Sequence, residues 1–174
     1  DFSFFGTRNI EIERHLYYER HRAVCAYARA NRLDVVEVAG PNDRMGIITA
    51  GKSHADTWQA LLDMGLDEEE LRRRGVRLLR VGLIYPVDGA RIREFAVGLR
   101  EIVVIEEKRG FLEAQVKEAL AGLPGPLTIV GKFDETGAPL FPIHGGMDSD
   151  IIAERLGPRL LRYAPDHAGI RRRL

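Results

Sequence analysis

The sequence predicts a three-layer α/β/α domain in which a mostly parallel sheet of five strands lies between helices. Short apolar runs alternate along the chain with segments whose apolar residues recur at helical spacing. Glycine and turn residues separate these segments, as they do in the β–α units of parallel sheets. The chain has 174 residues, 45% hydrophobic and 30% charged, which corresponds to one domain with a buried core and an extension.

The first 32 residues are expected to form a connector and a helix outside the sheet. Residues 1–9 contain Phe2, Phe4 and Phe5, and three exposed phenylalanines are unusual unless they dock on a neighbour. Residues 10–32 are rich in Glu, Arg and Ala and lack proline and glycine, which predicts a helix with a narrow apolar stripe.

Residues 33–157 are expected to form the sheet domain. Val35–Ala39 predicts a short strand, and the brief turn after it places this strand at an edge, antiparallel to the others. Gly46–Ala50 predicts the next strand. The helix after it is indicated by an apolar stripe of Ala55, Trp58, Leu61 and Leu62.

The second half of the domain continues the alternation. Asp67 is a plausible N-cap for a helix over residues 68–74, and Gly75 ends that helix. The three remaining strands are expected at residues 76–84, 102–107 and 127–130. Their helices are expected over Ile92–Leu99, over Gly110–Ala121 and, as a short helix capped by Asp148 or Ser149, around Ile152. Residues 158–174 are expected to form a basic tail that ends in three arginines.

Gly46–Ser53 also fits the phosphate-loop pattern G-x-x-x-x-G-K-[ST]. A phosphate loop needs the residues between its glycines to curl so that their N–H groups face the phosphate. Ile47 and Ile48 are β-branched and favour an extended backbone instead. We therefore interpret the segment as a strand, after which Lys52 and Ser53 begin a helix whose free N–H groups can donate to an anion or to a side-chain cap.

Four charged residues, Glu106 to Arg109, stand where the most apolar strand is followed by a helix. Parallel sheets bind ligands beyond the carboxyl ends of their strands, so Lys108 and Arg109 are candidate anion ligands. Successive side chains of an extended segment point to opposite faces, which directs Glu106 toward Lys108 and Glu107 toward Arg109. Charge compensation within the segment is the interpretation we favour for the two carboxylates, and they are not expected to converge as an acid/base pair.

Composition excludes several classes of function. The formal net charge is +0, so no global field attracts nucleic acid or anionic lipid. No apolar run approaches the roughly 20 residues of a membrane span. Cys25 is the single cysteine, which excludes a disulfide framework and an iron–sulfur cluster held by this chain's own thiolates, and it fits a reducing cytoplasm.

Four segments, in matching order and spacing, resemble indolepyruvate ferredoxin oxidoreductase in its long form with fused subunits. They are Gly46–Ser53, Val81–Pro86, Val103–Arg109 and Val130–Glu135. The likeness runs from about residue 22 to residue 157. The sequence departs from the family pattern at Ala50 and His54, where a serine and a tyrosine are expected, and over residues 143–150.

The resemblance implies a domain similar to the C-terminal domain of transketolase, with its first strand antiparallel. In the family, the intact enzyme, here called the parent enzyme, oxidatively decarboxylates an aryl 2-oxoacid to the acyl-coenzyme A. Thiamine pyrophosphate, magnesium and iron–sulfur clusters are held by its other domains, and electrons pass to ferredoxin. The resemblance assigns no catalytic residue or metal ligand to this stretch.

Two hypotheses of function remain from the sequence. The first is a structural and interface domain of that oxidoreductase, in contact with its other domains and not catalytic alone. The alternative is an independent module that binds an anion or a nucleotide, such as the phosphates of coenzyme A, through Lys52, Ser53 and Lys108.

Overall fold

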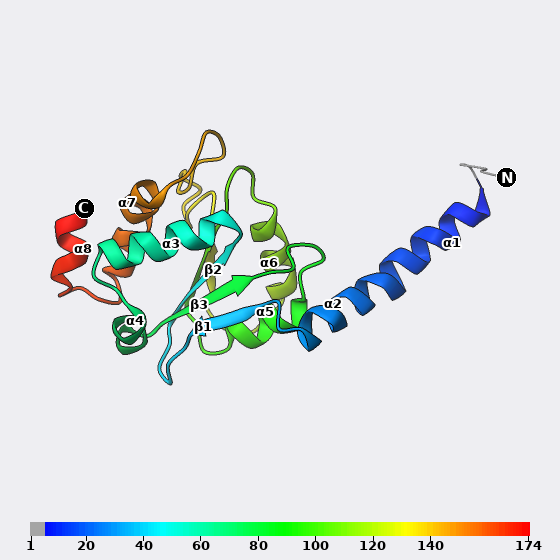
Figure 1. Cartoon of the computed structure of the whole chain (residues 1–174), viewed down its shortest axis with the longest axis horizontal. Coiled ribbons are helices and arrows are strands. Elements are labelled where there is room, and N and C mark those ends of the chain that lie inside the picture. The colour runs from blue at the N-terminus through cyan, green and yellow to red at the C-terminus, as the bar shows by residue number, and fades with distance from the viewer. Residues whose placement is uncertain (1–5) are drawn as a thin grey trace.

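The computed structural model describes residues 6–174, and the phenylalanines at positions 2, 4 and 5 lie outside the described residues. A sheet covered by helices forms the body of the molecule, and a long helix projects from it toward the N-terminus (Figure 1). Residues 7–9, expected as part of a connector, already belong to this helix. It comprises α1 (Thr7–His15), a π-helical turn η1 (Leu16–Arg20) and α2 (His21–Ala30).

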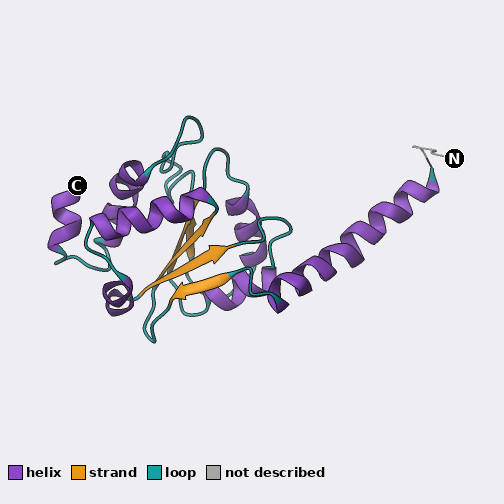
Figure 2. Ribbon diagram, in the orientation of Figure 1, coloured by secondary structure: helices purple, strands orange, loops and turns teal. Residues whose placement is uncertain are grey.

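The sheet has five strands in the order β1-β3-β2-β4-β5. β1 pairs with β3 in antiparallel fashion, and every other pairing is parallel, which confirms the predicted mixed sheet with an antiparallel edge strand (Figure 2). The strands are β1 (Val35–Val38), β2 (Met45–Ala50), β3 (Val76–Val81), β4 (Glu101–Ile105) and β5 (Thr128–Val130).

Two apolar cores, one on each face of the sheet, account for the three layers. Ile47 of β2 belongs to one core and Ile48 to the other, as expected for neighbouring residues of an extended strand. The first core is covered by α3 (Lys52–Asp63), α4 (Glu68–Arg74), α7 (Ser149–Leu160) and α8 (Ala168–Arg173), and the second by α5 (Gly89–Ala96) and α6 (Leu112–Leu120).

The apolar stripe predicted for α3 is correct at two positions and wrong at two. Leu61 is buried and Trp58 packs against the first core, but Ala55 and Leu62 are exposed. The buried face also includes Ser53, Thr57 and Ala60. These small and hydroxyl side chains lie where α3 packs against β2 and α7, so hydrophobicity alone missed part of this face.

Both ends of helix α4 lie where the sequence predicted them, whereas β3 ends earlier than predicted. Asp67 accepts a hydrogen bond from the Glu70 N–H, and Gly75 ends the helix in a left-handed conformation with φ of 70°, both as predicted. β3 ends at Val81 and not at residue 84, because the N–H groups of Gly82 and Leu83 donate to the Asp34 carboxylate.

The C-terminal segment packs on the body of the domain. Residue 158, at which the basic tail was expected to begin, lies inside α7. Ile170 of α8 is fully buried in the first core. The tail therefore covers part of the sheet face.

A buried ion network joins the start of β4 to α7 at the amino edge of the sheet. Arg159 of α7 is 4% exposed and donates to the Glu101 carboxylate and, at 2.7 Å, to Glu135. Tyr163 donates its hydroxyl to Glu101 at 3.0 Å, and burial raises the pKa of Tyr163 to about 12. The network ties residues that are 58 positions apart in the sequence.

Candidate functional site

The topology locates a crevice at the carboxyl edge of the sheet. The chain passes from β2 to β3 on one side and returns to β4 on the other side of β2. The strand order therefore reverses between β2 and β4, where open α/β sheets bind ligands. A cavity of about 450 Å³ lies there between residues 50–53 and 106–109, with Ile84 and Phe111 among its walls.

The phosphate-loop pattern is not a loop. Residues 45–50 are β2, paired with β3 and with β4 along its length, which confirms the strand interpretation. Gly46 meets a packing requirement, because a Cβ there would lie 2.6 Å from Leu99 Cδ1 and 2.7 Å from Phe95 Cε1. Gly51, with φ of 56°, makes the turn into α3.

Lys52 and Ser53 stand at the mouth of the crevice, but both are engaged by the chain itself. Lys52 Nζ donates to Asp56 Oδ2 at 2.5 Å and to the Met147 carbonyl at 3.0 Å, and the bond to Asp56 raises the pKa of the lysine. Ser53 is 2% exposed. Lys52 is thus placed to hold the residue 147 segment against α3, and a phosphate would have to displace it from these partners.

Glu106 caps helix α6. Its carboxylate accepts hydrogen bonds from the N–H groups of Phe111, Leu112 and Glu113, at 2.8 to 3.0 Å. These N–H groups have no partner inside the helix, and the positive end of the helix favours a negative charge. The partner of Glu106 is therefore the helix, and not Lys108 as the sequence suggested. Its carboxylate occupies the position in which a helix N-terminus would bind an external anion.

The other three charged residues of this segment diverge. Glu107 Oε1 lies 3.8 Å from Lys52 Nζ. Lys108 has a positive φ of 59°, and its Nζ donates to the Gly145 carbonyl. Arg109 lines the crevice and the neighbouring hollow beside Phe133. The two carboxylates point to different partners, as expected for residues that do not form an acid/base pair.

Lys132 is a functional candidate that the sequence reasoning missed. It follows β5 at the carboxyl edge and is 3% exposed, and burial lowers its pKa. Its Nζ donates to the carbonyls of Glu106 and Pro142. Its position directly after the last strand was the one available signal. Lys132 joins the ends of β4 and β5 to the loop that carries residue 142. Its role in this structure is therefore to stabilise the carboxyl edge of the sheet.

His54 takes part in a second buried network, between β1, β2 and α3. Its Nδ1 lies 2.8 Å from Thr49 Oγ1, and its Nε2 lies 3.1 Å from Glu37 Oε2. Glu37 also accepts from Trp58 Nε1 at 2.8 Å. The hydroxyl, imidazole and carboxylate are in the order of a catalytic triad, but Thr49 is fully buried and no substrate can reach it. We interpret the network as structural.

Burial lowers the pKa of His54 below its ordinary value of 6.5. Below pH 6.5 the unfolded chain then binds a proton that the folded state resists, so stability contributed by neutral His54 is present above pH 6.5 and lost as the pH falls through the folded-state pKa. We expect urea unfolding of the wild type to show this decline between pH 7 and 5, and His54→Gln to show a smaller one. An equal decline in both proteins would contradict the assignment.

A row of aromatic side chains runs from the projecting helix to the crevice. Tyr17 contacts His21 with ring centroids 5.2 Å apart, His21 contacts Tyr85 at 5.5 Å, and Tyr85 contacts Phe111 at 5.9 Å. Tyr17, Tyr85 and Phe111 are each about half exposed, and so is Ile84 beside them. We call these five residues the aromatic corner. Contiguous exposed apolar side chains mark interaction sites, and tyrosine and phenylalanine are enriched in protein interfaces.

The projecting helix is fixed to the same loop that carries Tyr85. Arg29 donates to both oxygens of Asp88 at 2.9 Å, and Asp88 is buried and caps α5. Ala28 packs at the base of the helix. The aromatic corner is therefore held from two elements, so the sheet edge and the helix present it together.

Across residues 6–174, no group of three or more His, Cys, Asp or Glu side chains is placed to hold a metal ion. None of the helices in that range is long and apolar enough to cross a membrane.

Comparison with known proteins gives a family match. The model of the indolepyruvate oxidoreductase domain matches residues 35–174. The indolepyruvate oxidoreductase subunit IorA of Pyrococcus horikoshii is 33% identical over 81 residues, which are 46% of this chain and 11% of the relative. The subunit of the same name from Methanothermobacter thermautotrophicus is 26% identical over 109 residues, 63% of this chain and 16% of the relative. The matches span only a small part of these relatives' length.

One solved structure supports the fold. The 2-oxoglutarate:ferredoxin oxidoreductase from Magnetococcus marinus, solved with 2-oxoglutarate, coenzyme A and succinyl-CoA bound, is similar with a TM-score of 0.53 at 16% identity, over 90% of this chain and 24% of that chain. A split-gene transketolase is similar with a TM-score of 0.46 at 18% identity, over 79% and 42% of the two chains.

Proposed function

The chain belongs to the indolepyruvate oxidoreductase domain family, and on that premise we propose that it is a structural and interface domain of the parent enzyme. Its role is to hold neighbouring domains in register, while the reacting groups come from elsewhere. Catalysis requires reacting groups to meet within fractions of an ångström, and a rigid sheet between neighbours supplies such positioning.

For the parent enzyme we propose oxidative decarboxylation of an aryl 2-oxoacid such as indolepyruvate to its acyl-coenzyme A, with ferredoxin as the electron acceptor. The names of the curated relatives support this substrate class. Thiamine pyrophosphate, magnesium and the iron–sulfur clusters are assigned to other domains. In support of this assignment, Cys25 is the single cysteine of the chain and cannot by itself hold an iron–sulfur cluster.

The aromatic corner is the observation that carries the interface proposal. At the carboxyl edge, where a ligand would bind, most charged groups are engaged internally: Lys52 by Asp56, Lys132 and Lys108 by carbonyl groups, and Glu106 by helix α6. Arg109 is the exception among the cations of this crevice in residues 6–174. Beside these groups, Ile84, Tyr85 and Phe111 expose apolar and aromatic side chains. Such a surface is better suited to a protein neighbour than to a phosphate.

We expect Tyr85→Ala together with Phe111→Ala to weaken the packing of this domain in the parent enzyme. Buried aromatic anchors of an interface contribute about 2 kcal/mol or more each, so the double variant should lose at least about tenfold in 2-oxoacid-dependent reduction of ferredoxin. Free-domain stability should change little, because both side chains are half exposed. Leu62→Ala, on exposed α3 surface, is the matched control and should leave the rate unchanged.

Calorimetry of the domain with ATP, coenzyme A and thiamine pyrophosphate tests the competing hypothesis. The interface role predicts no complex tighter than about millimolar, or about 4 kcal/mol. Micromolar binding abolished by Lys52→Ala would support an anion-binding module instead. For the aromatic corner itself, a parent enzyme that keeps its full rate of ferredoxin reduction with both Tyr85→Ala and Phe111→Ala would show that the proposed interface role is wrong.

A further inference from the structure

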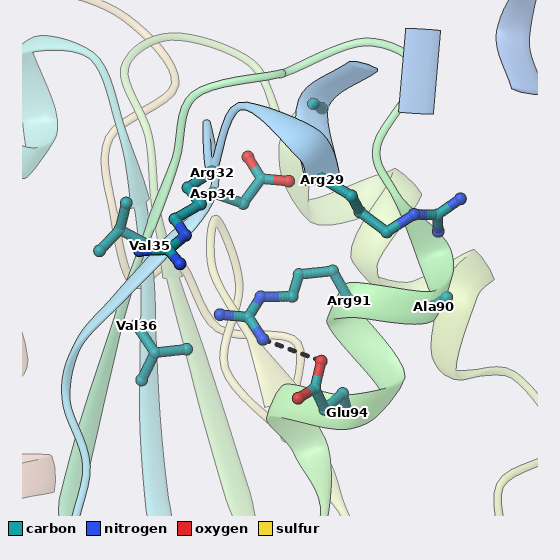
Figure 3. A pocket seen from close by; sticks show the side chains of 9 residues that line it. Arg29, Arg32, Asp34, Val35, Val36, Ala90, Arg91 and Glu94 are labelled. Atoms are coloured by element: carbon teal, nitrogen blue, oxygen red, sulfur yellow. Dashed lines mark hydrogen bonds and ion pairs between the residues drawn. The ribbon is translucent and has the colours of Figure 1, made fainter. Parts of the chain in front are cut away.

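A groove runs along the outer edge of the sheet, away from the carboxyl-edge crevice. Its volume is about 420 Å³, and its walls come from the base of α2, from β1 and from the first turns of α5 (Figure 3). Both Val35 and Val36 line it. Neighbouring residues of a strand point to opposite faces, so a groove that touches both reaches the open edge of β1, where α5 of the second face forms its other wall.

The main chain of β1 is available on that side. β1 is the last strand of the sheet order and pairs only with β3 among the described strands. One side of such a strand presents N–H and C=O groups to which an extended peptide can add. β1 has four residues and an irregularity in register between Val36 and Val38, so backbone pairing alone would hold a peptide weakly.

Three arginines surround the groove. Arg29 is bonded to Asp88, and Arg91 Nη1 is 2.8 Å from Glu94 Oε2 on the same helix. Arg91 extends from α5 toward β1 in Figure 3, while Arg32 approaches from the base of α2. Within residues 6–174, no hydrogen bond or ion pair engages the Arg32 side chain.

The acidic residues of the groove are directed to partners other than Arg32. The Asp34 carboxylate already accepts from the N–H groups of Gly82 and Leu83, at 2.9 and 3.2 Å. Glu94 is an exposed partner in an i, i+3 pair, which stabilises only weakly in water. Arg32 is thus free to receive a carboxylate, whereas Arg91 would have to exchange its weak pair with Glu94 for one. The guanidinium fork of both residues matches carboxylate geometry.

We propose that this groove, lined by Arg29, Arg32, Arg91 and the edge of β1, binds an extended acidic segment from another domain or subunit of the parent enzyme. The segment lies as an added strand beside β1 and places an Asp or Glu side chain between Arg32 and Arg91. The proposal rests on the interface function above and names a second contact surface for it. A peptide fits better than a small anion, because the strand edge offers main-chain partners along the groove in addition to charge.

Hydrogen exchange in the intact parent enzyme tests this proposal. Arg32→Glu with Arg91→Glu should speed exchange of the amides of residues 34–38 by about tenfold, which corresponds to about 1.4 kcal/mol. Arg155→Glu with Arg172→Glu, an equal change of charge on α7 and α8, should leave that exchange unchanged. Arg32→Gln provides a milder second variant and should give a smaller increase in the same amides.

A photo-crosslinking residue at position 35 identifies the occupant. Crosslinks to a segment with Asp or Glu support the proposal, whereas crosslinks only to a segment without acidic residues would overturn it. Unchanged exchange of the amides of residues 34–38 in the Arg32→Glu, Arg91→Glu variant would also overturn the proposal. So would protection of these amides that disappears in phosphate-free buffer and returns when inorganic phosphate is added, because the occupant would then be a small anion. If the groove fails these tests while the aromatic corner still affects turnover, the interface function stands and only this surface is rejected.

Discussion

Arg159→Ala should lower the free energy of unfolding by about 3 to 5 kcal/mol, the range found when one partner of a buried ion pair is removed. Arg159 and Glu101 are 4% and 3% exposed, so the variant leaves the Glu101 carboxylate in the interior without its cation. Tyr163 alone would remain as its donor. Urea unfolding at pH 7 measures the loss.

Arg155→Ala is the matched control, since Arg155 lies one turn earlier on α7 and its ion pair with Glu154 is exposed. Its cost should stay within about 0.5 kcal/mol. Glu101→Gln combined with Arg159→Met removes both charges and should recover part of the loss, because the remaining groups need no counter-ion. A cost below about 1 kcal/mol for Arg159→Ala would show that the network does not stabilise the fold.

Arg159→Ala should also change how the stability of the domain depends on acid pH. A hydrogen bond from Arg159 holds the pKa of Glu135 at about 2, below its ordinary value of 4.5. The stabilisation from this carboxylate is therefore present above pH 4.5 and lost as the pH falls toward 2. Without Arg159 the pKa of Glu135 rises toward its ordinary value, and that part of the acid dependence should shrink.

Glu106→Ala should have the second largest effect, on the order of 3 kcal/mol. Hydrogen bonds to a charged group contribute about 1.5 to 3 kcal/mol, and loss of an N-cap costs about 1. The change leaves three N–H groups at the start of α6 without an acceptor, two of them on buried residues, Leu112 and Glu113. Glu106 also opposes the lowering of the Lys132 pKa by burial, so its removal should make the lysine easier to neutralise.

Glu107→Ala provides the control. The Glu107 carboxylate is partly exposed, and its ion pair with Lys52 is long, at 3.8 Å. Its cost should be below about 1 kcal/mol. Urea unfolding gives the two energies, and hydrogen exchange at residues 111–113 should speed up in the Glu106 variant alone. If both variants cost the same, Glu106 does not act as the cap of α6.

Local sequence signals predicted most of the fold. The β-branched pair Ile47 and Ile48 marked β2 despite its phosphate-loop pattern, and Asp67 and Gly75 marked the two ends of α4. The brief turn after β1 indicated the antiparallel edge strand. These predictions succeeded because extended preference, capping and turn formation depend on residues close together in the chain.

The candidate site was only partly predictable. The sequence drew attention to residues 106–109 and to the carboxyl edge, and the structure places both around one crevice. It could not reveal that Glu106 turns back onto α6 or that Lys132 is buried beneath the edge. The aromatic corner also escaped it, because Tyr17 and Phe111 become the two ends of one row, through His21 and Tyr85, only in the folded chain.

The sequence by itself therefore determined the order and type of the elements from β1 to the start of α7, the antiparallel edge and the family resemblance, but not that the expected tail forms the end of α7 and α8. Tertiary structure alone decided which charges are neutralised and by what, as with Arg159 and Glu101 at the amino edge. It also decided which face of α3 packs inward, against its hydrophobic pattern at Leu62. The reason is physical: the energy of a charge or an apolar group depends on its burial and on its spatial neighbours, and these are fixed only when distant segments pack together.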